Sequence, residues 1–267
     1  MSTSPATTDA VAGSADTAAP AVVIPQLRPR GVAAVWAAAA VPMATLAWLV
    51  APAVAGHLSG TGRVPMVKAL ITCLTIGLIW QFVLVAILVG REQGTLRWAV
   101  VRDALWLHSP RSPRSGRVGG RVWLILIPLI ALFGCEQFSP SLPTPANRDL
   151  GMFLGSDAGH AFMHGPWGWY GVLLTCWVFN TVLGEELLFR GYLLPRMNGA
   201  CGRWDWLVNG VIFACYHLHE PWIIPSALMD TFVVAYPTKR YRSAWIGIAV
   251  HSSQSVFFAI IALTLVR

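Results

Sequence analysis

The chain alternates between long apolar runs and shorter polar or basic segments. The runs cover residues 32–55, 66–90, 122–138, 169–194, 206–218, 222–236 and 244–266. Because a membrane-spanning helix needs about 20 mostly apolar residues, the longer runs are typical of membrane spans, whereas 206–218 and 222–236 are short for an untilted crossing. The pattern predicts an all-α, polytopic helical membrane protein with about seven transmembrane helices, in a range of six to eight.

The N-terminal segment has a different composition from the rest. Residues 1–30 are rich in Ser, Thr, Ala and Pro and show no apolar periodicity, so they cannot bury enough apolar surface to fold. We predict a disordered cytoplasmic tail at 1–30 and a single transmembrane helical domain at 31–267. The first apolar run exceeds the 7–15 residues of a signal-peptide core, so we expect it to be a retained span.

The overall composition supports the membrane class. Only 12% of the residues are charged and 55% are hydrophobic, whereas soluble proteins carry about 25% charged residues. This excludes a disordered chain and argues against a soluble domain. The five cysteines form no CxxC pair, so we interpret them as small apolar side chains rather than as a disulfide framework or a zinc site.

The net charge of +7 is consistent with nucleic-acid binding or with the positive-inside rule, under which Lys and Arg gather on cytoplasmic loops. With the N-terminus inside, the seven spans place fifteen of the nineteen basic residues on the inner side, and the outer side keeps Arg63, Lys68, Arg148 and Arg267. We therefore predict a cell-membrane protein with a cytoplasmic N-terminus, an outer C-terminus and no nucleic-acid partner.

Ionisable residues inside the apolar runs are candidates for function, because burying charge in a membrane is costly. Glu186 and Arg190 are four residues apart, so they share a helix face and are placed to form an ion pair. Glu185 points about 100° away, is left without a partner on its own helix, and could act as a general base. The alternative is a buried ion-pair cluster that only joins helices.

Two histidines lie at a similar depth to this carboxylate. Counted from the inner end of each run, Glu185, His217 and His251 are about 7–11 residues in, which is roughly 10–17 Å at 1.5 Å per residue. Such a set can activate water in one of two ways. Glu185, His217 and His251 could ligate Zn²⁺ with one position open, or Glu185 and His217 could polarise water directly while His251 and its neighbours stabilise an oxyanion. Both routes lead to hydrolysis, most naturally of a peptide bond.

Three short motifs at these positions resemble one known family. Residues 185–190 (EELLFR), 213–217 (FACYH) and 251–255 (HSSQS) are similar to the EExxxR, FxxxH and HxxxN motifs of the CAAX-protease and bacteriocin-processing (CPBP) intramembrane proteases, and the resemblance covers about residues 165–260. It implies a type II CAAX prenyl protease-like fold and a metalloprotease-type or metal-free endopeptidase activity. It also implies that Glu185 activates water with help from His217, that Glu186 and Arg190 orient it, and that His251 helps to hold the oxyanion.

One motif position departs from the family. Ser255 stands where the family has Asn, and its shorter side chain reaches less far, although Gln254 is a substitute donor. Three functions follow from the sequence: an intramembrane endopeptidase acting on a protein or peptide at the membrane, a catalytically silent scaffold of the same family, and a proton-coupled transporter. His160 and His164 form an HxxxH pair, but they lack the Glu of HExxH, so we interpret them as loop histidines.

Overall fold

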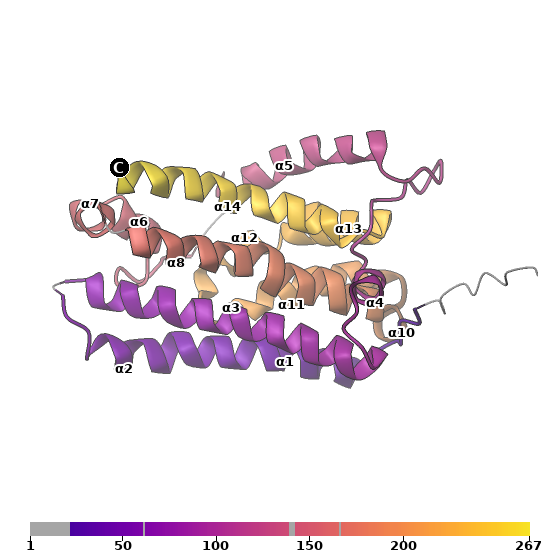
Figure 1. Cartoon of the computed structure of the whole chain (residues 1–267), viewed down its shortest axis with the longest axis horizontal. Coiled ribbons are helices and arrows are strands. Elements are labelled where there is room, and N and C mark those ends of the chain that lie inside the picture. Colours follow the sequence, from indigo (N-terminus) through magenta and orange to yellow (C-terminus); the bar gives the residue numbers. More distant parts are fainter. Residues whose placement is uncertain (1–21, 61, 139–141, 166) are drawn as a thin grey trace, which may run out of the picture.

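The structure, a computed structural model, describes residues 22–60, 62–138, 142–165 and 167–267. Four long helical stretches lie side by side along one direction (Figure 1). The first runs from Pro29 to Ala55, and α3 (Val64–Gln93) returns beside it. The third runs from Trp167 to Arg196, and α14 (Ala244–Val266) is the last. The first stretch consists of α1 (Pro29–Thr45), η1 (Leu46–Val50) and α2 (Ala51–Ala55); the third consists of α8 (Trp167–Val178), η4 (Phe179–Gly184), η5 (Leu187–Leu193) and α9 (Leu194–Arg196).

Shorter helical elements complete the bundle and connect its ends. Between α3 and α8 lie α4 (Trp98–Ala104), η2 (Gly120–Ile125), α5 (Leu126–Gly134), η3 (Cys135–Phe138), α6 (Leu150–Leu154) and α7 (Asp157–Met163). Between α9 and α14 lie α10 (Asn198–Cys201), η6 (Gly202–Trp204), α11 (Asp205–Tyr216), η7 (Pro221–Ile223), α12 (Ile224–Ala227), η8 (Thr231–Ala235) and α13 (Tyr236–Tyr241).

The membrane prediction is confirmed: the chain is a multi-pass helical membrane protein. Within the described ranges, the four long stretches have the length and apolar character of membrane spans, and Gly120–Gly134 is a shorter apolar helix. The predicted fifth and sixth runs are helical but short. Residues 206–218 form most of the 12-residue α11, and 222–236 is divided among η7, α12 and η8, because prolines at 221 and 225 each begin a new turn.

The helix ends follow local sequence signals. Proline occupies the first turn of α1 and of α3, where its missing N–H costs nothing. Gly94 ends α3 with a left-handed φ of 68° and donates its N–H to the Gly90 carbonyl at 2.9 Å. Asp149 caps α6 by accepting from the Met152 N–H at 2.7 Å.

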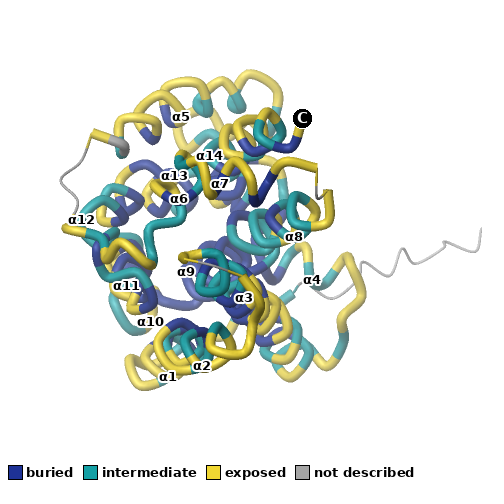
Figure 2. The backbone as a smooth tube through the Cα atoms, turned by 90° about the vertical axis from the view of Figure 1, so that its left-hand side faces the viewer, coloured by how far each residue is buried: buried dark blue, intermediate teal, exposed yellow. Residues whose placement is uncertain are grey.

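The core lies where α1, α3, η5 and α11 meet. Its buried side chains include Met43, Leu78, Leu188, Phe189 and Phe213. Figure 2 shows the buried residues on the inward faces of the helices and the exposed residues on the outward faces. Many outward residues are large and apolar, including Ile76, Val83, Ile127, Val256 and Ile260. These side chains are suited to contact lipid tails rather than water.

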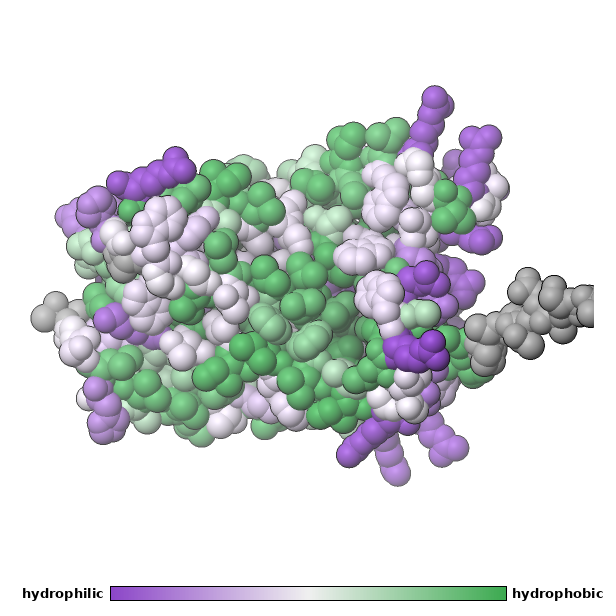
Figure 3. Space-filling view, viewed as in Figure 1, coloured by the Kyte–Doolittle hydropathy of each residue, from purple (hydrophilic) through white to green (hydrophobic). Residues whose placement is uncertain are grey.

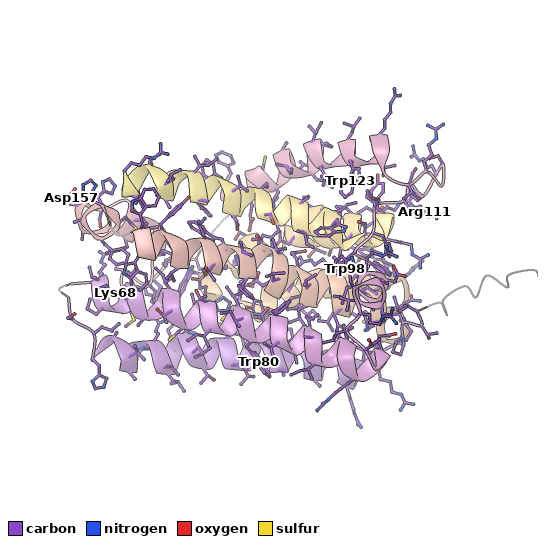
Figure 4. The ribbon with its side chains drawn as sticks, viewed as in Figure 1. Lys68, Trp80, Trp98, Arg111, Trp123 and Asp157 are labelled. Atoms are coloured by element: carbon purple, nitrogen blue, oxygen red, sulfur yellow. The ribbon has the colours of Figure 1, made fainter. Side chains whose placement is uncertain are left out.

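The surface is divided along the bundle axis. Figure 3 shows hydrophobic residues along the middle and hydrophilic residues gathered at both ends. In Figure 4, Lys68 and Asp157 lie near one end and Arg111 at the other, with Trp98 and Trp123 close to the Arg111 end. This banding is the expected result of a bilayer around the middle of the bundle, with tryptophans near its boundary.

The ordered chain begins before the predicted boundary at residue 31. Gln26 donates to the Pro195 carbonyl at 3.0 Å and accepts from the Gly199 N–H at 3.0 Å, and Leu27 donates its N–H to the Arg196 carbonyl at 2.8 Å. The tail prediction at 1–30 is therefore too long at its end. Residues 1–21 lie outside the described residues, so disorder there stays a prediction. The five cysteines are free thiols.

Candidate active site

The two adjacent carboxylates lie in the middle of the third long stretch, where the helix changes its winding. The π-helical segment η4 ends at Gly184 and a second, η5, begins at Leu187, so Glu185 and Glu186 stand between two wide turns. Such turns are rare and occur frequently at functional sites. Gly184 allows α3 to pass closely, because a Cβ at this position would lie 3.0 Å from the Leu78 carbonyl oxygen.

Glu186 is fully buried and is the centre of an ionic cluster. Its Oε1 lies 3.2 Å from Arg190 Nη1 and 3.0 Å from His251 Nδ1. The first contact confirms the predicted i,i+4 ion pair. The second was not anticipated, because the sequence analysis assigned His251 to an oxyanion rather than to this carboxylate. The cluster ties the third stretch to α14 and compensates the negative charge of Glu186.

Gly247 makes this approach of α14 sterically allowed. A Cβ at this position would lie 2.5 Å from Glu186 Oε2, 3.0 Å from Thr238 Oγ1 and 3.2 Å from Arg190 Cγ. The first distance is shorter than any real carbon–oxygen contact, so a side chain here would displace the carboxylate. The absence of a side chain at Gly247 therefore allows α14 to pack directly against the ionic cluster.

Glu185 is also buried, with 2% exposure, but its partners differ from those of Glu186. With its amide nitrogen turned toward the carboxylate, Asn180 donates to both Oε1 and Oε2 at 3.0 Å. The Tyr216 hydroxyl also bonds to Glu185 and accepts from Gln81 Nε2 at 2.5 Å. Within the described part of the chain Glu185 makes no ion pair. Neutral donors thus hold this carboxylate, as expected for a group that must gain and lose a proton.

His217 follows directly after the last residue of α11. Its Nδ1 lies 3.1 Å from the Phe213 carbonyl oxygen, so Nδ1–H donates one turn back along the helix and Nε2 is left free. The ring is 7% exposed. This backbone bond fixes both the ring orientation and the nitrogen that is available for chemistry.

Two aromatic side chains of α11 connect these groups. The Phe213 ring lies 4.9 Å from that of His217 and 6.0 Å from that of His251, measured between centroids, and the Arg190 guanidinium lies 3.9 Å from the Phe213 centroid. Tyr216, which bonds to Glu185, has its ring 5.0 Å from that of His217. The predicted carboxylates and histidines are therefore gathered around Phe213 and Tyr216.

Ser255 is buried on α14, one turn after His251. Its hydroxyl makes no hydrogen bond within the described residues, whereas Ser252 Oγ, on the same helix, contacts Thr181 Oγ1 at 3.2 Å. Ser255 lies on the same helix as His251. Its hydroxyl makes no hydrogen bond to the other predicted site residues among those described.

Comparison with known proteins identifies the segment that carries this geometry. Residues 166–257 match the family model of the type II CAAX prenyl endopeptidase Rce1-like proteins, and this range contains both carboxylates, Arg190 and both histidines of the site. The chain carries an Rce1-like domain. The predicted resemblance to the CAAX proteases is thereby confirmed over residues 166–257, and the match supports a CAAX-type intramembrane protease fold for this segment. The curated proteins and the solved structures compared with this chain give no match.

The metal-ligating side chains of the Rce1-like domain are not grouped in threes within the described residues. Among the described residues, no group of three or more His, Cys, Asp or Glu side chains is placed to hold one ion. His251 directs Nδ1 to Glu186, and His217 directs Nδ1 to a backbone carbonyl, bonds that fix the orientation of each ring and point Nε2 the other way. Binding of Zn²⁺ by Glu185, His217 and His251 stays a prediction.

Asn180 and Asn209 are two further polar residues of the Rce1-like domain. With its amide turned toward the carboxylate, Asn180 donates to Glu185 on its own helical stretch. A π-turn brings residues five apart together, and only that spacing could have signalled the contact. Asn209 does link helices, since it donates to the Phe189 carbonyl at 2.8 Å. His160, on α7, stands outside the matched range and apart from the site.

Proposed function

We propose that the protein is an intramembrane endopeptidase in which Glu185 activates a water molecule. The observation that carries the proposal is the contrast between two adjacent carboxylates. Glu186 is neutralised by Arg190 and His251, whereas the hydrogen bonds to Glu185 among the described residues come from the neutral side chains of Asn180 and Tyr216. A buried carboxylate without a counter-ion is suited to accept a proton during a reaction.

The proposed reaction uses only protein side chains. Glu185 takes one proton from water while the water oxygen attacks the carbonyl carbon of a peptide bond, and the carbonyl electrons move onto oxygen. His217, with Nε2 free, orients the water. The proton on Glu185 then passes to the leaving nitrogen as the carbon–nitrogen bond breaks. The products are a new carboxyl terminus and a new amino terminus.

His251 is proposed to stabilise the oxyanion formed in that reaction. Its Nδ1–H is used by Glu186 at 3.0 Å, so the doubly protonated ring would offer Nε2–H to the substrate oxygen. A donor of this kind contributes about 10²–10³ in rate where it has been removed from other enzymes. Arg190 and Glu186 act through His251, as positioning residues.

The proposed substrate is a protein or peptide in or at the membrane. The site lies within the membrane-spanning bundle, so a peptide bond must approach through the lipid or from the end of the bundle. We further propose that the basic end faces the cytoplasm, with the N-terminus on that side and the C-terminus on the other, because basic residues gather on cytoplasmic surfaces.

A catalytically silent scaffold is the second candidate. The unpartnered hydroxyl of Ser255 favours it, because the family motif has Asn at this position and the shorter side chain leaves one oxyanion donor missing. Both proposals predict the same fold, but they differ in whether cleavage depends on Glu185.

The test compares membrane peptides from cells that lack the protein and are complemented with one of four forms. These are the wild type, Glu185→Gln, His217→Ala and, as a control histidine outside the site, His160→Ala. Endopeptidase activity predicts a set of cleaved termini that appears with wild type and His160→Ala and disappears with both site variants. If all four forms give the same termini and the same cell phenotype, the scaffold proposal replaces the protease.

Chelation gives a second, independent prediction. Because metal-ligating side chains are not grouped in threes within the described residues, we expect the cleavage of an identified peptide by purified protein to be unchanged after treatment with 1,10-phenanthroline. Loss of activity on chelation and its return with added Zn²⁺ would contradict the metal-free reaction while leaving the protease assignment intact.

A further inference from the structure

The basic end of the bundle contains a pocket that the proposed reaction does not use. It has a volume of about 470 Å³ and lies between α5, the η8–α13 segment and the loop at residues 112–114. Leu129 and Phe232 contribute apolar lining, Tyr236 and Tyr241 contribute aromatic lining, and Arg114 and Arg240 contribute positive charge. Among the described residues, none of those that line the pocket is acidic. The pocket thus combines apolar surface with uncompensated positive charge.

The two arginines have no protein partner. Arg114 and Arg240 are exposed, and within the described ranges neither takes part in an ion pair. By contrast, Lys239, next to Arg240, is paired with Asp205, and Arg196 at the same end is paired with Glu92 through two hydrogen bonds of 2.6 and 2.8 Å. The pocket therefore carries two guanidinium groups that are free to bind an external anion.

The loop that carries Arg114 is fixed against α13. Arg111 donates its N–H to the Tyr241 carbonyl at 3.0 Å, and Ser112 donates its N–H to the Arg117 carbonyl at 2.8 Å. Arg111 also forms an antiparallel bridge with Val118. Figure 4 shows Arg111 on this loop at the end of the bundle. These bonds fix the loop that carries Arg114 next to α13, which carries Arg240, and both arginines line the same pocket.

The surroundings of the pocket indicate that its ligand has an apolar part. Phe232 is 62% exposed, and Leu124, in η2, and Ile127, in α5, are 59% and 68% exposed. Phe232 lines the pocket, and Leu124 and Ile127 lie on either side of the lining residue Ile125 in sequence. A ligand that reaches both regions must be an amphiphile with an anionic head.

We propose that this pocket binds one acidic phospholipid, with its phosphate between Arg114 and Arg240 and its acyl chains along α5 and Phe232. Guanidinium groups bind phosphate oxygens through paired hydrogen bonds, and basic pockets between helices near the cytoplasmic surface are suited to anionic headgroups. This site does not depend on the proposed protease activity, because none of its residues belongs to the active site.

The test measures lipid binding to the full-length protein in phosphatidylcholine nanodiscs. Fluorescent phosphatidylglycerol is titrated against the wild type, the double variant Arg114→Ala/Arg240→Ala, and the matched double variant Arg117→Ala/Arg203→Ala. The matched variant removes the same charge from the same end outside the pocket. We expect saturable binding to the wild type, a weakening of about tenfold or more in the first variant, and a change within about twofold in the second.

Further measurements make each outcome decisive. Arg114→Lys/Arg240→Lys should keep most of the binding, which separates loss of charge from misfolding. Equal losses in both alanine variants would overturn the proposal in favour of general surface attraction. Competition by inorganic phosphate as strong as that by unlabelled phosphatidylglycerol would reduce the pocket to an anion site and also overturn it, as would the absence of saturable binding to the wild type.

Discussion

At the scale of single residues, Glu185 and Glu186 are neighbours with opposite roles. Glu186 faces α14, where Arg190 and His251 share its Oε1, and Glu185 faces Asn180 and Tyr216. The two carboxylates have different partners because adjacent helical residues point about 100° apart. The i,i+4 spacing made the Glu186–Arg190 pair predictable from sequence. The contact from His251 was not predictable, since it depends on how closely two distant helices approach.

Substitution of Gly247 tests whether the close packing of α14 against Glu186 is required. We expect Gly247→Ala to destabilise the protein by about 1–3 kcal/mol, since added atoms in a filled core force displacement, and to abolish cleavage, because the added methyl group displaces Glu186. Thermal unfolding in detergent and cleavage of an identified peptide measure the two effects.

The matched control is Gly171→Ala on α8. A Cβ at Gly171 meets nothing within 4 Å, so this variant should be as stable as the wild type or slightly more stable. If Gly247→Ala behaves like Gly171→Ala in both assays, the close packing of α14 on the ionic cluster is not required.

At the scale of elements, the π-helical winding of the third long stretch determines which side chains surround Glu185. The apolar pattern predicted a regular helix over 169–194, and its position and length were close to the observed Trp167–Arg196. The two π-segments within it were not predictable, because an apolar pattern does not distinguish an α-turn from a wider one. They nevertheless determine which side chain reaches Glu185.

Substitution of Asn180 tests whether the contact with Glu185, which the π-helical winding makes possible, contributes to catalysis. We expect Asn180→Ala to lower kcat by about 10–100-fold while KM stays nearly unchanged, because the amide orients the catalytic carboxylate without touching the substrate. Thr175→Val is the control on the same stretch, since the Thr175 hydroxyl donates only to the Gly171 carbonyl. An equal rise in KM, or equal effects of the two substitutions, would contradict the positioning role.

At the scale of the whole molecule, the bundle has an apolar middle and charged ends (Figure 3). Composition and run lengths were sufficient to predict the multi-pass helical class. They did not predict that the sixth run is divided by prolines and by short π- and 3₁₀-helical segments, whereas the fifth run forms the single short helix α11. They also extended the N-terminal tail over residues that hydrogen-bond to the end of α9 and to α10.

The orientation in the membrane is a prediction at this scale. Ser115→Cys marks the basic loop and Asp157→Cys marks the opposite end, each in a variant whose native cysteines are replaced. With intact cells and a membrane-impermeant maleimide, we expect labelling of Cys at 157 and not at 115 until the membrane is opened. The reverse pattern would contradict the proposed orientation.

The most direct test of the whole account is the rate at which purified Glu185→Gln protein in liposomes cleaves a peptide identified from wild-type cells. The substitution keeps the size of the side chain and removes its ability to accept a proton. We expect a loss of at least about a hundredfold in kcat with thermal stability close to that of the wild type. A folded Glu185→Gln variant that cleaves within about twofold of the wild-type rate would contradict the central role of Glu185.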